Sequence, residues 1–186
     1  MSRRALRRLT LTAVFLALGI VLPFVTGWIP AVGKMLLPMH IPVMLCGLVC
    51  GPVWGLGLGL SLPLLRSALF SMPPVWPDAV GMTFELAAYG LVIGLVFRRF
   101  RRPGIGAVYA SLGIAMLAGR LVWGAARTVL LGFGGADFSF EIFFAAGFVR
   151  ALPGILLQLV LIPALMMFLS KTGVLLPENN KNKNDR

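Results

Sequence analysis

Residues 37–74 read LPMHIPVMLCGLVCGPVWGLGLGLSLPLLRSALFSMPP, and this stretch decides the fold. Two apolar segments meet at Gly51-Pro52, a connection so short that the segments must form an antiparallel helical hairpin. Gly51, Gly55 and Gly59 recur at every fourth position, which places them on one helix face where another helix can approach closely. We therefore expect the remaining helices to be arranged around this hairpin.

The composition identifies the class of protein. The 186 residues are 59% hydrophobic and 12% charged, with a mean hydropathy of +0.93, whereas soluble domains are about 25% charged. We conclude that the chain is an integral protein of the lipid bilayer. Its net charge is +11, but the basic residues stand in clusters at the edges of apolar runs, which is typical of a topology signal. No soluble basic domain remains to bind nucleic acid, so we expect no nucleic-acid partner.

The apolar runs predict an all-α protein with six transmembrane helices. The helices are expected at residues 9–24, 40–50, 53–70, 79–97, 105–131 and 140–169. We interpret the first as an uncleaved helix, because no convincing cleavage site follows it. Residues 71–78 and 132–139 are expected to be loops, and Pro153 and Pro163 to bend the last helix.

The distribution of basic residues predicts the orientation. Clusters of arginine and lysine lie at the N-terminus, between the fourth and fifth helices and in the C-terminal tail, all on one side of a six-span chain. The positive-inside rule makes that side the cytoplasm, so both termini are expected inside. We expect residues 1–170 to form one transmembrane domain and residues 171–186 a polar, disordered cytoplasmic tail.

Charged side chains within or near the ends of the spans are the first candidates for function. They are Arg66, Glu85, Arg120, Arg127 and Arg150. A charge at the centre of a helix costs about 2.5–3.5 kcal/mol on insertion scales, so it usually faces a partner or a wet cavity. Counting residues from the helix ends places all of them in the outer half of the bilayer, with Arg120 and Arg150 deepest. One carboxylate cannot neutralise these arginines, so surplus positive charge is expected to face an anion.

A tryptophan adds to this group. Arg120 and Arg127 are seven residues apart and share a helix face with Trp123 beside them. Guanidinium groups next to an indole suit a flat, anionic ligand. The alternatives are that Arg66 and Arg127 extend to the membrane surface, that Glu85 neutralises one arginine, and that Trp123 packs against lipid or the core.

His40 and Tyr89 complete the candidate site. His40 lies between two prolines at the expected outer start of its helix and faces the same region, so we expect it to contact the ligand. Tyr89 follows Glu85 by four residues and can share its helix face. The alternatives are a capping role for His40 and core packing for Tyr89.

The sequence gives little support for an enzyme, a metal site or a cofactor. The zinc-protease, nucleophile-elbow and Walker patterns are all missing, so any ATP-driven activity must come from a partner protein. Cys46 and Cys50 are four residues apart, but with a single histidine in the chain they lack the ligands of a closed metal site. We interpret them as small buried residues.

Four sequence features together carry a family resemblance. They are Ala13-x-x-x-Ala17 in the first helix, Leu37-Pro38-x-His40-Ile41-Pro42, the glycine-rich hairpin, and Phe84-Glu85-Leu86-Ala87-Ala88-Tyr89-Gly90. From its basic N-terminus to Leu169, the chain resembles the substrate-binding S components of energy-coupling factor (ECF) transporters. The combination is specific for the family and not for a substrate.

This resemblance implies a function and a set of partners. S components lie in the bacterial plasma membrane and bind a vitamin or related micronutrient from outside, below the loop between the first two helices. They deliver it through a transmembrane coupling protein and two cytoplasmic ATPases. By this likeness Ala13 and Ala17 would touch the coupling protein, and residues 25–37, with Trp28 and Lys34, would form a lid. The family binds its substrates with differing residues, so the resemblance assigns no binding residue.

We therefore expect a substrate-capture subunit for a small anionic, vitamin-like nutrient. A pantothenate- or folate-like molecule fits the arginines, and a cation such as thiamine is disfavoured. One alternative is a stand-alone secondary transporter or channel, although the inner halves of the helices carry almost no ionisable residues for a coupling ion. A second is a membrane-embedded enzyme or accessory protein, which would need acid, base or metal ligands that the sequence lacks.

Overall fold

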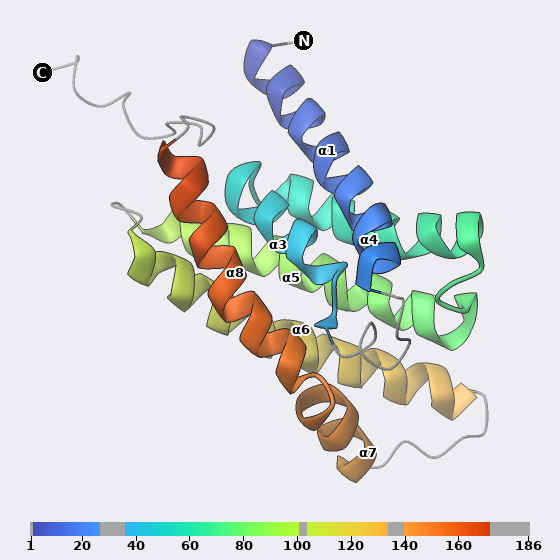
Figure 1. Cartoon of the computed structure of the whole chain (residues 1–186). Coiled ribbons are helices and arrows are strands. Elements are labelled where there is room, and N and C mark those ends of the chain that lie inside the picture. The colour runs from blue at the N-terminus through green and yellow to red at the C-terminus, as the bar shows by residue number, and fades with distance from the viewer. Residues whose placement is uncertain (1, 27–35, 101–103, 134–139, 172–186) are drawn as a thin grey trace, which may run out of the picture.

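The computed structural model describes residues 2–26, 36–100, 104–133 and 140–171, and these residues form helices without strands. The elements are α1 (Arg3–Thr26), α3 (His40–Val49), α4 (Pro52–Phe70), η1 (Val75–Ala79), α5 (Val80–Arg99), α6 (Ile105–Phe133), α7 (Phe140–Phe144), η2 (Ala145–Val149) and α8 (Leu152–Lys171). Among them, five stretches of helix are long and apolar enough to cross a membrane, and α3 is a shorter apolar helix. The all-α membrane fold is therefore confirmed (Figure 1).

Helix α3 forms the centre of the bundle. All its residues from His40 to Val49 are buried, as expected for a helix that is apolar on every side. Ten residues rise only about 15 Å, roughly half the thickness of the hydrocarbon core. The expected second span is thus too short to cross the bilayer alone. Instead α3 packs against α1, α4, α5 and α8, which enclose it (Figure 1).

The glycine face of α4 packs directly on the backbone of α5. Gly51 has a φ of 104°, a conformation that L side chains rarely adopt, and it makes the sharp turn between α3 and α4. A Cβ added at Gly55 would lie 2.5 Å from the carbonyl oxygen of Gly90, and one at Gly59 would lie 2.4 Å from the backbone of Leu86. The predicted close approach is confirmed, and the structure identifies α5 as the helix that approaches.

This contact yields a stability prediction with a control on the same helix. Gly55→Ala is expected to lower the free energy of unfolding by about 1–3 kcal/mol, because the new methyl group forces α4 and α5 apart. At Gly57 an added Cβ meets nothing within 4 Å, so Gly57→Ala is expected to be neutral or slightly stabilising. Thermal unfolding of the purified protein in detergent measures both. Equal melting temperatures for the two variants would contradict the backbone contact.

The C-terminal region differs from the single bent helix expected over residues 140–169. It consists of the short helix α7, the wide turn η2 and the long helix α8, with a turn at Arg150 and Ala151. The break comes just before Pro153, which stands in the first turn of α8, where a missing N–H disrupts no hydrogen bond. Helix α8 runs on through Pro163. Residues 71–74 form the expected loop, and η1 leads into α5 with a non-helical backbone at Trp76 (φ −114°, ψ 134°).

The ends of the chain agree with an even number of crossings. The start of α1 and the end of α8 lie at the same end of the bundle (Figure 1). We call the opposite end, which holds His40 and Ser71, the outer end, following the charge distribution. The orientation itself stays a prediction. Labelling of an introduced cysteine at Ser71 only from outside the cell, and at Gly104 only from inside, tests it. Residues 172–186, the predicted tail, lie outside the described residues.

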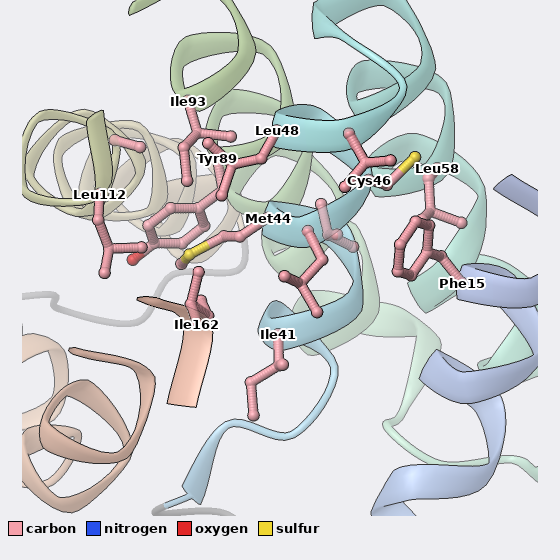
Figure 2. Close-up of a cluster of buried hydrophobic side chains, with 14 of the residues drawn as sticks. Phe15, Ile41, Met44, Cys46, Leu48, Leu58, Tyr89, Ile93, Leu112 and Ile162 are labelled. Carbon is pink, nitrogen blue, oxygen red and sulfur yellow. The ribbon is translucent and has the colours of Figure 1, made fainter. Parts of the chain in front are cut away.

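Apolar side chains from several helices meet α3 to form the core (Figure 2). Met44 of α3 lies with Tyr89 of α5, Leu112 of α6 and Ile162 of α8 in this cluster, and each of them is fully buried. Cys46 is buried on the side of α3 that faces α1, where its Sγ lies 3.6 Å from the Oγ1 of Thr12. This apolar layer forms the base of the polar cluster described next.

Candidate functional site

Three polar side chains from three helices meet inside the bundle. Arg120 of α6 places its Nη1 2.9 Å from the Oε1 of Glu85 on α5, and the Nε2 of His40 on α3 lies 3.4 Å from the same oxygen. Their side chains are 5%, 2% and 1% exposed, respectively. Burial of this kind costs several kcal/mol for each ion unless partners compensate. The ion pair joins α5 to α6 inside the bundle.

Several polar atoms of this group have no hydrogen-bond partner among the described residues. They are the Nε and Nη2 of Arg120, both ring nitrogens of His40, and the Oε1 of Glu85. The ion pair is therefore an electrostatic contact without hydrogen-bond alignment. A buried donor or acceptor left unpaired costs about 1–3 kcal/mol, so such groups call for a bound molecule that pairs with them.

A fourth polar side chain, Gln158 of α8, is 1% exposed and has an unpaired Nε2. Its depth along the bundle can be judged from the apolar layer of Met44, Tyr89, Leu112 and Ile162 in Figure 2. His40, Glu85 and Gln158 each precede a member of that layer by four residues, namely Met44, Tyr89 and Ile162. All three helices run in the same direction from the outer end, so the three polar side chains lie one turn outward of the apolar layer.

The helix α6 runs the opposite way, so Arg120 also lies outward of Leu112 in the apolar layer. We call His40, Glu85, Arg120 and Gln158 the polar cluster. Tyr89 closes it from below, with its ring centroid 5.2 Å from that of His40 in an edge-to-face arrangement. The polar cluster thus has an apolar base on the side away from the outer end.

A second ion pair lies nearer the outer end. Arg127 donates a hydrogen bond from Nη2 to the Oδ1 of Asp78, which belongs to η1. The guanidinium carbon of Arg127 lies 5.6 Å from the ring centroid of Trp123, and Trp123 is stacked on Phe143 at 6.1 Å. The sequence placed Arg127 beside Trp123, and the structure does the same. Sequence analysis placed position 78 only within an expected loop and missed the role of Asp78 as counter-ion.

Arg66 contacts α1 and does not join the polar cluster. Its Nη1 donates a 2.7 Å hydrogen bond to the carbonyl oxygen of Ile20 on α1. The guanidinium carbon lies 4.9 Å from the ring centroid of Phe24 and 5.9 Å from that of Phe70. Such cation–π contacts contribute about 0.5–2 kcal/mol each. Arg66 therefore fastens the outer end of α1 to α4, with its side chain 8% exposed.

Arg150 is not the deep side chain that the sequence predicted. It is exposed and stands in the turn between η2 and α8. The prediction was wrong because it assumed one continuous helix from residue 140, in which position 150 would lie three turns inside. The surplus of positive charge is consequently smaller than expected. Arg127 has Asp78, Arg66 has a carbonyl group and aromatic rings, and only Arg120 has Glu85.

Comparison with known proteins identifies the family. Residues 7–176 match the family model described as "ECF transporter, substrate-specific component". The chain belongs to this family. Comparisons with curated proteins and with solved structures gave no match. The family makes the chain a multi-pass membrane subunit that binds a small molecule and works with a coupling protein and ATPases. The resemblance seen in the sequence is thus confirmed at the level of the family.

The predicted contact surface for the coupling protein lies on α1. Ala13 and Ala17 are exposed on α1, a helix that is mostly unburied within the chain. Trp28 and Lys34, the expected lid residues, lie outside the described residues. Within residues 2–26, 36–100, 104–133 and 140–171, histidine, cysteine, aspartate and glutamate do not gather in a group of three or more that would hold a metal ion.

Gln158 is a second residue whose role sequence analysis missed. It is the only glutamine of the chain and stands in the middle of a long apolar helix. Scanning for charged residues passes over an uncharged amide, although an unpaired amide in a membrane helix is also costly. A scan for every polar side chain inside a span would have found it.

Proposed function

We propose that this S component captures a small anionic, vitamin-like nutrient from the outer side and that the polar cluster binds it. The single observation that carries this proposal is the state of Arg120. Its Nη1 lies against Glu85, which orients the guanidinium group, while Nε and Nη2 lack partners among the described residues. These two atoms form one edge of the planar group, and that edge suits the two oxygens of a carboxylate or phosphate.

The proposal for an anion now rests on this free edge of Arg120 rather than on a surplus of arginines. A ligand carboxylate there would satisfy two buried donors at once. Glu85 balances the charge of the arginine but lies at Nη1, so it leaves the free edge open. The amide of Gln158 and the nitrogens of His40 are available for a second polar group of the same ligand. A cationic ligand such as thiamine would face the charge of Arg120. Pantothenate- and folate-like molecules fit better.

The partners follow the same pattern as in the family. In our proposal the loaded S component delivers its ligand through a transmembrane coupling protein and two ATPases in the bacterial plasma membrane. By the family likeness we assign Trp28 and Lys34 to the lid, and Arg127, Trp123 and Asp78 to the outer rim of the site. The main alternative is a secondary transporter or channel that works alone.

Two measurements test the proposal. Mass spectrometry of ligand that co-purifies with the protein is expected to identify a compound with at least one carboxylate or phosphate. Uptake of that compound is then compared in cells that express the S component with and without an ECF coupling protein and its ATPases. We expect uptake only with the complete module. Equal uptake without the module would support a stand-alone transporter, and a co-purified cation would contradict the anionic site.

A further inference from the structure

The charges in the polar cluster balance without a ligand. Arg120 carries one positive charge, Glu85 one negative charge, and Gln158 is neutral. These two charges cancel when the imidazole of His40 is neutral. If an anion binds at the free edge of Arg120, the buried cluster gains a net negative charge. An uncompensated charge in a region of low dielectric is expensive, so a second positive charge is needed when the ligand is bound.

His40 is placed to supply that charge. Its Nε2 lies 3.4 Å from the Oε1 of Glu85, and neither ring nitrogen has a hydrogen-bond partner among the described residues. A neutral imidazole has one N–H donor, whereas the protonated ring has two. The protonated ring can therefore direct one N–H to Glu85 and the other to the ligand. Histidine is also the side chain whose charge changes most readily between about pH 5 and 8.

Among the described groups that face His40, none is better placed than His40 to take up the proton. From α5 it faces Glu85 and the ring of Tyr89, and from α6 the pair Arg120–Glu85. From α8 the polar group at this level is the uncharged amide of Gln158. On α4, Arg66 is bound to the carbonyl group of Ile20 on α1.

The remaining charges of α1 lie far from His40. Its arginines at positions 3, 4, 7 and 8 precede Thr12, which contacts Cys46. Position 46 is already well along α3 towards its opposite end. Glu85 is ion-paired to Arg120, so its protonation would cost that pair.

We propose that this S component binds its ligand anion together with one proton, which His40 takes up. The inference rests on the proposed function, because it requires an anion at Arg120. Its consequence has a definite sign. Affinity falls as the pH rises through the range in which the complex keeps this proton and the free protein does not. The decrease reaches about tenfold per pH unit. Below that range, the dependence on pH levels off.

The test measures protons directly. Calorimetric titrations at pH 7 with pantothenate, folate and nicotinate, repeated in buffers of different ionisation enthalpy, give the number of protons taken up for each anion that binds. The full-length protein is expected to take up close to one proton. His40→Gln, which keeps a polar side chain but cannot become cationic, is expected to take up close to none and to show a flat dependence of affinity on pH. Arg150→Ala serves as the control, since Arg150 is exposed and lies outside the polar cluster.

The outcomes separate this inference from the proposed function. Binding of an anion by the unaltered protein without proton uptake overturns the inference and leaves the anion site intact. Uptake that persists in His40→Gln also overturns it, because another group would then take up the proton. Failure of all three anions to bind overturns the anion site and the inference together. The measurement on the unaltered protein keeps the proposal open to contradiction even if His40→Gln does not fold.

Discussion

Replacing Arg120 with alanine is expected to weaken binding of the anionic nutrient by roughly 30- to 4,000-fold, or about 2–5 kcal/mol. Two effects add. The free edge of the guanidinium that holds the ligand is lost, and Glu85 remains at 2% exposure without its cation. Isothermal titration calorimetry on the purified protein, with the co-purified compound as ligand, measures the change.

Control variants separate recognition from general damage. Arg120→Lys keeps the charge but not the planar edge, so an intermediate loss is expected. Arg127→Ala removes a partly exposed side chain already paired with Asp78, and Arg150→Ala removes an exposed one, so each is expected to change affinity less than about threefold. The double variant Arg120→Met with Glu85→Gln avoids an unpaired buried charge, which protects the fold. If it binds the ligand normally, the polar cluster is not the binding site.

Replacing both Ala13 and Ala17 with tryptophan is expected to abolish uptake while affinity for the ligand changes less than about twofold. Both alanines are exposed on α1, so the new side chains can point away from the protein without displacing its other helices. A partner helix that packs on small residues would be held away by two indole rings, because close packing of membrane helices depends on small side chains at the contact. Uptake in cells with the complete ECF module and calorimetry on the isolated S component measure the two quantities.

Val160→Trp provides the matched control for this experiment. Val160 is 71% exposed on α8, so the variant adds the same aromatic ring to a lipid-facing position of another helix. We expect normal uptake and normal binding. Loss of binding in the alanine variant would show that Ala13 and Ala17 pack inside the protein. Normal uptake would show that the coupling protein uses another surface.

Much of the polar cluster follows from the sequence. Glu85 and Arg120 stand inside apolar helices, where the cost of a charge makes a functional or paired role the default expectation. In the structure His40 begins its helix, as expected. Glu85 and Tyr89, four residues apart, also share a helix face, because both contact His40. What these patterns do not contain is the pairing. Asp78 and Ile20 lie far along the chain from Arg127 and Arg66, and only helix packing brings them together.

The sequence by itself determined the membrane class, the all-α fold and the glycine face of α4, because hydropathy and spacing are local properties of the chain. It also determined the family, which the match of residues 7–176 to the family model confirms. Only the tertiary structure decided which arginine keeps a free edge, that α3 is a short helix enclosed by its neighbours, and that Arg150 is exposed. These features depend on which helices touch and on where the backbone turns, and such contacts between distant segments are fixed only when the whole bundle has packed.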